Sequence, residues 1–179
     1  FITFRPAPVH APDGFHSLAD PRYDEFWHTV ADAGIVAAFH GADSGYGVFT
    51  EMWGESKTYT GHKMSALSEV MGVHVERPVY DLIASLICHG LFDRVPKLRI
   101  ATVELGAGWV GDLCRRLKRS YGKTPQLYKR DPLDTFHDHV WVAPFYEDDV
   151  ANIRDLIGAD RMLMGSDWPH PEGLASPYE

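Results

Sequence analysis

The segment Arg161-Met-Leu-Met-Gly-Ser-Asp-Trp-Pro-His170 places a carboxylate directly after a short apolar run. We predict a buried strand over residues 161–164, which Gly165 ends, and Pro169 prevents a helix from starting there. A second apolar run, Ile35-Val-Ala-Ala-Phe-His-Gly41, ends in a histidine and a glycine. In α/β barrels the catalytic groups follow the carboxyl ends of the strands. The two segments therefore indicate a functional site on an α/β fold.

Apolar runs and amphipathic segments alternate along the chain. The expected strands cover residues 1–5, 35–39, 98–105, 139–143 and 161–164. The expected helices cover residues 20–34, 78–90, 110–117 and 147–157, with a further helix around 63–71 inside a long loop over 41–77. Residues 122–138 are expected to form a loop, with a helical turn as the alternative. This alternation predicts parallel βαβ units with right-handed crossovers.

The number of βαβ units is too small for a whole barrel. A (β/α)8 barrel needs roughly 250 residues, so 179 residues fit part of one or a small doubly wound sheet. We expect an α/β fold that forms a partial (β/α)8 TIM barrel, about strands four to eight, as a single domain over residues 1–179. The chain opens on Phe1 inside a strand-like pattern and stops at Glu179 in a loop. We interpret it as a fragment that lacks the N-terminal strands.

Composition excludes several classes of partner. The net charge is −8, which gives no basic surface for nucleic acid. No apolar run approaches the roughly 20 residues that a membrane span needs. Neither a Gly-x-Gly-x-x-Gly motif after the first strand nor a phosphate-binding loop is present, which weighs against nucleotide binding. We expect a cytoplasmic protein that acts on a small molecule, without nucleic acid or membrane partners.

Asp167 is the strongest candidate for chemistry. It stands beside Trp168 and Pro169 in a stiff, partly apolar setting, where a carboxylate can have a shifted pKa or bind a metal ion and orient its water. The alternative is a carboxylate that only caps a turn. We expect Asp167 to be catalytic and a metal ligand, and we expect Trp168 and His170 to bind substrate. The alternative for His170 is a loop histidine without a role.

Three further candidates stand at or near strand ends. His40 is either a satisfied core histidine or, at a rim, a neutral imidazole that suits a transition metal. Glu104 is a carboxylate near the end of a buried run, which is costly unless paired. It is therefore a catalytic residue, which we prefer, or half of an ion pair with an arginine such as Arg99. Arg5 either binds a substrate carboxylate or is a solvated charge.

Five segments, in their order along the chain, resemble a known family. They are Arg5-Pro6, Asp20-Pro-Arg-Tyr-Asp-x-x-Trp27, Ala38-Phe-His-Gly41, Gly90-x-Phe-Asp-Arg-x-Pro-Lys-Leu-Arg99 and Gly165-Ser-Asp-Trp-Pro-His170. Together they resemble the amidohydrolase superfamily, in the subgroup (amidohydrolase family 2) that includes aminocarboxymuconate-semialdehyde decarboxylase and related metal-dependent hydrolases.

The resemblance implies a metal-dependent (β/α)8 barrel. It implies that His40 is the strand-five metal ligand and that Asp167 is the strand-eight aspartate, which binds the metal and its water. Zinc (Zn2+) is the usual metal of the subgroup, and another divalent transition metal is the alternative; bound zinc lowers the pKa of its water to about 7.

The chain departs from the family pattern at two places. The His-x-His pair of the first strand is missing, and the pair His137-Asp-His139 stands before the expected strand over 139–143. Glu104 occupies a place where many members have a histidine acid or base, and a glutamate with a raised pKa can also transfer protons.

Two hypotheses from different classes follow. The first is a metal-dependent hydrolase or non-oxidative decarboxylase that acts on a small carboxylated or cyclic compound. The second is a catalytically inactive partial barrel that acts only as a structural or assembling piece. Open sheet edges favour association, so a homo-oligomer fits this reading.

Overall fold

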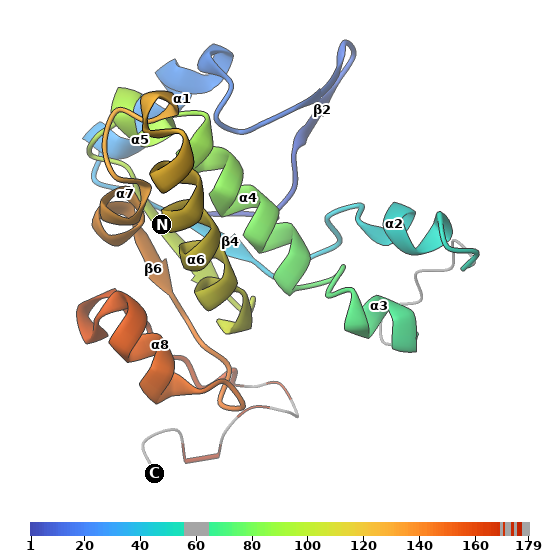
Figure 1. Cartoon of the computed structure of the whole chain (residues 1–179). Coiled ribbons are helices and arrows are strands. Elements are labelled where there is room, and N and C mark those ends of the chain that lie inside the picture. Colours follow the sequence, from blue (N-terminus) through green and yellow to red (C-terminus); the bar gives the residue numbers. More distant parts are fainter. Residues whose placement is uncertain (56–64, 169, 171–172, 174, 177–179) are drawn as a thin grey trace.

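The structure is a computed structural model that describes residues 1–55, 65–168, 170, 173 and 175–176 (Figure 1). Its centre is a parallel sheet of order β1-β4-β5-β6. The strands are β1 (Ile2–Phe4), β4 (Val36–His40), β5 (Arg99–Val103) and β6 (Val140–Val142). The predicted α/β class with a parallel sheet is confirmed.

The strand predicted over residues 161–164 is wrong. Arg161 ends a short 3-10 helix, η3 (Ala159–Arg161), and the next residue makes only an isolated parallel bridge between Met162 and Val142. Leu163 N donates to Val142 O at 2.8 Å. A single ladder contact on one side does not define a strand. Residues 161–163 are only partly buried and Met164 is exposed, so the segment is not enclosed on both faces.

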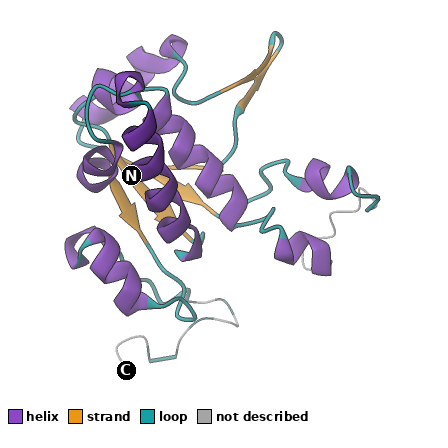
Figure 2. Cartoon of the chain, in the orientation of Figure 1, coloured by secondary structure: helices purple, strands orange, loops and turns teal. Residues whose placement is uncertain are grey.

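The predicted helices pack against this sheet (Figure 2). They are α1 (Asp24–Asp32), which follows the 3-10 turn η1 (Pro21–Tyr23), α4 (Glu76–Cys88), α6 (Gly108–Lys123) and α8 (Val150–Ile157). Asp20 caps the first of these segments by accepting from Arg22 N at 3.0 Å. The helices begin close to the Asp-Pro, Pro and Gly signals in the sequence, because those residues satisfy or remove the unpaired N–H groups of a first turn.

The loop predicted over residues 122–138 is also wrong. It contains the turn η2 (Pro125–Leu127) and the helix α7 (Pro132–His139). Asp131 caps α7 by accepting from Leu133 N at 2.9 Å. The Asp131-Pro132 pair is the same start signal as Asp20-Pro21 and could have revealed this helix.

Four short elements add to the predicted plan. A hairpin of β2 (Val9–Ala11) and β3 (Gly14–His16) follows β1, and α5 (Leu91–Arg94) follows α4. In the long loop, α2 (Gly47–Glu51) was not predicted, and α3 (Ala66–Val70) falls inside the helix expected around 63–71.

The core lies between the sheet and its helices. Alternate strand residues such as Phe39, Ile100 and Val142 are fully buried together with side chains of α4 and α6. Trp27 of α1 is fully buried as well, and its Nε1 donates to Leu18 O at 2.7 Å. The fixed position of each strand end depends on this packing.

The α2–α3 lobe (residues 47–51 and 66–70) projects from this body (Figure 1). Tyr46 OH donates to Asp81 Oδ2 of α4 at 3.2 Å, and Arg77 Nε donates to the same oxygen at 3.0 Å. The Arg77 guanidinium also lies 5.4 Å from the centre of the Phe49 ring. These contacts fasten the lobe to the first turns of α4.

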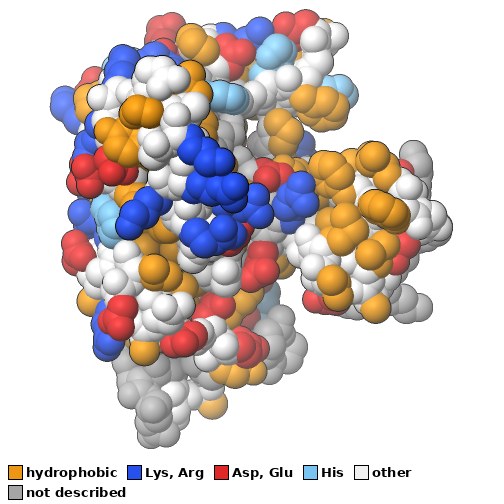
Figure 3. Space-filling view, in the orientation of Figure 1, with side chains coloured by type: hydrophobic (Ala, Val, Ile, Leu, Met, Phe, Trp, Pro, Cys, Tyr) orange, Lys and Arg blue, Asp and Glu red, His pale blue; other side chains and the backbone are white. Residues whose placement is uncertain are grey.

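Apolar side chains gather on the surface of this lobe (Figure 3). The large exposed ones are Val48, Met52, Trp53 and Val70. Among the described residues, no helix has the length and apolar character that a membrane crossing requires.

Candidate metal centre

The candidate site forms at the carboxyl edge of the parallel sheet. All four strands run in the same direction, so their carboxyl ends meet at one edge. Arg5 follows β1, His40 is the last residue of β4 and Glu104 follows β5 directly. In open α/β sheets and barrels this edge is where ligands bind.

The side chains of His40 and Glu104 are in polar contact across the ends of β4 and β5. His40 Nε2 lies 2.9 Å from Glu104 Oε2, and both side chains are partly exposed. His40 Nδ1 lies 3.0 Å from Gly41 O. Because a carbonyl can only accept, Nδ1 is the donor there, which leaves Nε2 directed at the carboxylate. Glu104 is thus paired with His40, and the alternative pairing with Arg99 is wrong, since Arg99 instead donates to Gly34 O at 2.5 Å.

Gly41 allows the two strand ends to approach so closely. A Cβ atom at this position would lie 2.8 Å from Glu104 O. Real Cβ atoms essentially never come within 3.0 Å of a heavy atom outside their own and the adjacent residues, so any side chain would push the strand ends apart.

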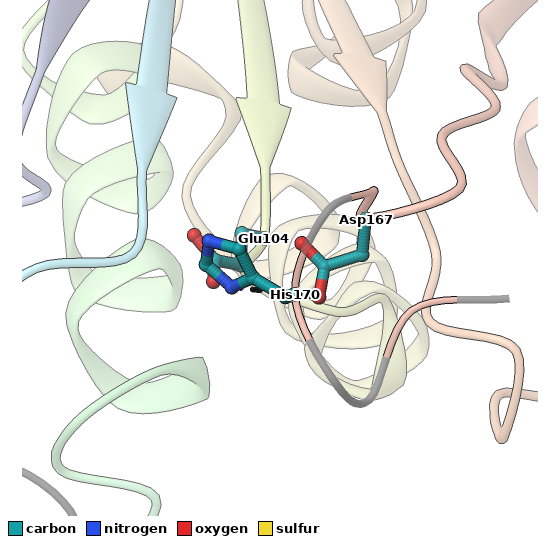
Figure 4. A group of neighbouring side chains, drawn as sticks. All are labelled: Glu104, Asp167 and His170. Atoms are coloured by element: carbon teal, nitrogen blue, oxygen red, sulfur yellow. Dashed lines mark ion pairs between the residues drawn. The ribbon is translucent and has the colours of Figure 1, made fainter.

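Glu104, Asp167 and His170 meet at this edge (Figure 4). One possible ligand atom from each residue lies within 4.8 Å of those of the other two. Among the described residues, this is the cluster of three His, Cys, Asp or Glu side chains that could hold a metal ion. His170 Nδ1 is 3.8 Å from Asp167 Oδ2. His40 lies outside this group of three and joins it through Glu104.

The backbone is strained at two of these residues. Glu104 has φ of 54° and Asp167 has φ of 56°, and they are the described non-glycine residues with positive φ. The left-handed region is unfavourable for residues with a Cβ, and it persists where the surrounding structure enforces it, often at functional sites. Such strain at both carboxylates indicates that their directions are fixed for a purpose other than packing.

The donor set fits a divalent metal ion. Protein oxygen and nitrogen ligands lie about 2.0–2.2 Å from zinc, so two ligands of one ion are at most about 4.4 Å apart. The Glu104–Asp167–His170 group is within a small adjustment of this limit. In addition, the 2.9 Å contact between His40 Nε2 and Glu104 Oε2 needs a proton or a cation between two lone pairs. Carboxylate and imidazole ligands suit zinc and manganese.

Two expected substrate-binding residues lie outside the group. Arg5 is exposed and its Nη1 is 3.5 Å from Asp43 O, in the loop that follows His40. Trp168 is 81 % exposed, and its backbone N donates to Ser166 Oγ at 3.3 Å. Neither side chain belongs to the group formed by Glu104, Asp167 and His170.

A second carboxylate pair lies close to the site. Burial, and then the charge of Asp148, raise the pKa of Glu76 above its usual value. Glu76 is the first residue of α4, and a Cβ at Gly108, the first residue of α6, would collide with its Oε1. Sequence reasoning gave no sign of either carboxylate, because neither follows a strand.

Comparison with known proteins places this geometry in context. The sequence profile of the amidohydrolase family matches residues 4–179. A gamma-resorcylate decarboxylase of Polaromonas sp. is 27% identical over 154 residues, which cover 83% of this chain and 44% of the relative. The crystal structure of an amidohydrolase from Mycobacterium avium subsp. paratuberculosis superposes with a TM-score of 0.87 at 40% identity, over 98% of this chain and 43% of that one.

A more distant solved structure shares the fold. It is a dihydroxybenzoic acid decarboxylase from Polaromonas sp., which contains bound manganese and an inhibitor. It superposes with a TM-score of 0.56 at 22% identity, over 87% of this chain and 46% of that one. The chain thus spans less than half the length of each of these three proteins.

Proposed function

This chain belongs to the amidohydrolase family, and on that premise we propose that it carries the metal centre of a non-oxidative decarboxylase that acts on a small carboxylated cyclic compound. The observation that supports this most is the meeting of Glu104, Asp167 and His170 at the carboxyl edge of the sheet. Curated relatives that are decarboxylases of an aromatic acid support the reaction. The single domain over 1–179 would then be a section of a (β/α)8 barrel.

We assign the metal ion to Asp167 and His40, with His170 next to them. When bound, a divalent metal neutralises and polarises a substrate carboxylate. We expect zinc from the donor set, and manganese in a related decarboxylase supports a divalent ion of this kind.

We assign proton transfer to Glu104. In decarboxylation the bond between the ring carbon and the carboxylate breaks, CO2 leaves, and the electron pair stays on the ring carbon. A proton must then reach that carbon, and the Glu104 carboxyl is an acid that lies beside Asp167 and His170. His40 Nε2 lies 2.9 Å from Glu104 Oε2, so this acid stands directly beside one of the proposed metal ligands.

We assign substrate binding to Arg5, Trp168 and His170. Arg5 stands at the end of β1, and a guanidinium there can bind a carboxylate with two parallel hydrogen bonds. The exposed Trp168 ring offers a flat apolar surface to a cyclic substrate.

Hydrolysis is the second candidate function. The solved relative with 40% identity is described as an amidohydrolase. Hydrolysis needs the same metal centre, with Glu104 as the base that takes a proton from water.

The test combines metal content with turnover. Purified chain is loaded with Zn2+ or Mn2+, and bound metal is measured by elemental analysis for the parent and for Asp167→Asn, His40→Ala and Glu104→Gln. We expect the first two variants to lose metal. Glu104→Gln should keep metal and lose turnover, and loss of metal in this variant would instead make Glu104 a ligand.

Turnover is measured as CO2 release from 2,6-dihydroxybenzoate, the acid named for another solved relative, and as hydrolysis of aryl esters and cyclic amides. CO2 release supports decarboxylation, and ester or amide cleavage supports the second candidate. A metal-loaded chain that does neither would overturn the enzyme proposal in favour of an inactive structural piece.

A further inference from the structure

The turn between β5 and α6 has an unusual backbone. Glu104 and Gly106 both have positive φ, 54° and 58°, within three residues. Glycine adopts this region freely, but glutamate does so at a cost. Contacts outside the turn must therefore hold Glu104 in its conformation.

Asp148 supplies such contacts from another part of the chain. Its Oδ2 accepts a hydrogen bond from Ala107 N at 2.8 Å and a second from Phe145 N at 2.7 Å. One carboxylate oxygen thus joins the β5–α6 turn to the segment that follows β6. Hydrogen bonds from backbone N–H groups to a carboxylate are stronger than those between neutral groups.

Two aromatic side chains support the same turn. The Phe145 ring lies so close to Gly106 that a Cβ there would be 2.9 Å from two ring carbons. Trp109 Nε1 donates to Gly106 O at 2.9 Å in a buried position. The turn is therefore held on several sides, and Asp148 provides both the bond to Ala107 and the bond that fixes the backbone of Phe145.

We propose that Asp148 is a positioning residue, which holds Glu104 in the left-handed conformation that directs its carboxylate toward His40, Asp167 and His170. Asp148 does not belong to the site itself, and it acts through the backbone of the turn. The proposal rests on the metal centre proposed above for its functional consequence, but its structural content concerns only the backbone of Glu104.

The test compares three substitutions. Asp148→Ala removes the acceptor, Asp148→Asn keeps an oxygen that can accept both hydrogen bonds, and Asp155→Ala is the control. Asp155 is an exposed aspartate on α8 that pairs only locally with Arg154. Binding of Co2+ to each metal-free variant is measured by calorimetry, with the visible spectrum of the bound ion and the melting temperature recorded beside it.

We expect Asp148→Ala to weaken Co2+ binding about 10- to 100-fold, because a displaced Glu104 no longer orients the neighbouring side chains of His40 and Asp167, which we propose as the metal ligands. Asp148→Asn and Asp155→Ala should bind with nearly parental affinity and an unchanged spectrum. A purely structural role would instead make affinity follow melting temperature across the set, without rescue by asparagine. That result, or parental affinity in Asp148→Ala, would overturn the proposal.

A parent chain that binds no Co2+ would contradict the metal centre alone. The positioning claim is then decided by the crystal structure of Asp148→Ala. Loss of positive φ at Glu104 in this variant, with positive φ kept in Asp148→Asn, supports the claim. Positive φ retained at Glu104 in Asp148→Ala overturns it.

Discussion

Replacement of Gly41 by alanine should damage the candidate site and the fold together. The new Cβ would lie 2.8 Å from Glu104 O, which is a backbone atom and cannot rotate away. An ordinary contact needs at least 3.4 Å, so the ends of β4 and β5 must separate by about 0.6 Å. The same movement stretches the 2.9 Å contact between His40 Nε2 and Glu104 Oε2 to about the limit of a hydrogen bond.

Overpacking of this kind lowers the free energy of unfolding by about 1–3 kcal/mol. The assay is urea unfolding of the parent and Gly41→Ala. The slope of the unfolding free energy against urea concentration is compared between the two, and equal slopes verify that both unfold in the same single step. Gly111→Ala is the matched control, because Gly111 lies inside α6 and a Cβ there meets only Leu156 Cδ1 at 3.6 Å. This control should gain about 1 kcal/mol, since alanine favours a helix interior over glycine.

The two alanine substitutions should thus shift the unfolding midpoint in opposite directions. If Gly41→Ala unfolds at the parental urea concentration or above it, the close approach of β4 and β5 does not depend on this glycine. Glycine at position 41 would then not be required for the geometry of the site.

Three further predictions concern the fold. Arg94→Ala should lower the free energy of unfolding by about 2–3 kcal/mol, because the guanidinium bonds to both oxygens of the partly buried Asp24 and to two backbone carbonyls. Lys97→Ala breaks an exposed ion pair and should change the same quantity by no more than about 0.5 kcal/mol in the urea assay. Thr102→Val should raise the free energy of unfolding by about 1 kcal/mol, since the Thr102 hydroxyl is fully buried and has no partner among the described residues; a loss of stability would mean that a water satisfies it. Burial, and secondarily the nearby carboxylate of Asp81, raises the pKa of Tyr46 from 10.0 to about 12. The contribution of Tyr46 to stability should therefore be complete below pH 10 and fall as the pH rises toward 12, because this tyrosine loses its proton at a lower pH in the unfolded chain than in the folded one. A Tyr46→Phe variant that shows the same fall in urea unfolding would contradict this.

The local signals of the sequence predict much of this fold. Apolar runs locate β4 and β5, and Asp20-Pro21 and Pro78 mark the starts of helices. The same reasoning applied to Asp131-Pro132 would have found α7. A local pattern could not show that residues 161–164 fail to form a strand. A strand needs a neighbouring strand to pair with, and that neighbour lies elsewhere in the sequence.

The candidate site is only partly predictable, for a related reason. His40, Glu104, Asp167 and His170 carry the residue types and positions that sequence reasoning selects, and the structure brings them to one edge. The pairing of His40 with Glu104 depends on strand register. Asp148 lies 41 positions from the turn that it bonds, and neither periodicity nor motif connects the two.

The attachment of the α2–α3 lobe has an evolutionary consequence. The lobe is fastened to α4 by the hydrogen bond from Tyr46 to Asp81 and by the Arg77 guanidinium over the Phe49 ring, and none of its described residues belongs to the hydrophobic core. Its buried side chains include only the small polar residues Thr50 and Ser68. Substitutions on its surface therefore carry little penalty for folding of the sheet. The surface of this lobe can therefore change in evolution at little cost to the sheet, so new surface chemistry can arise without loss of the scaffold.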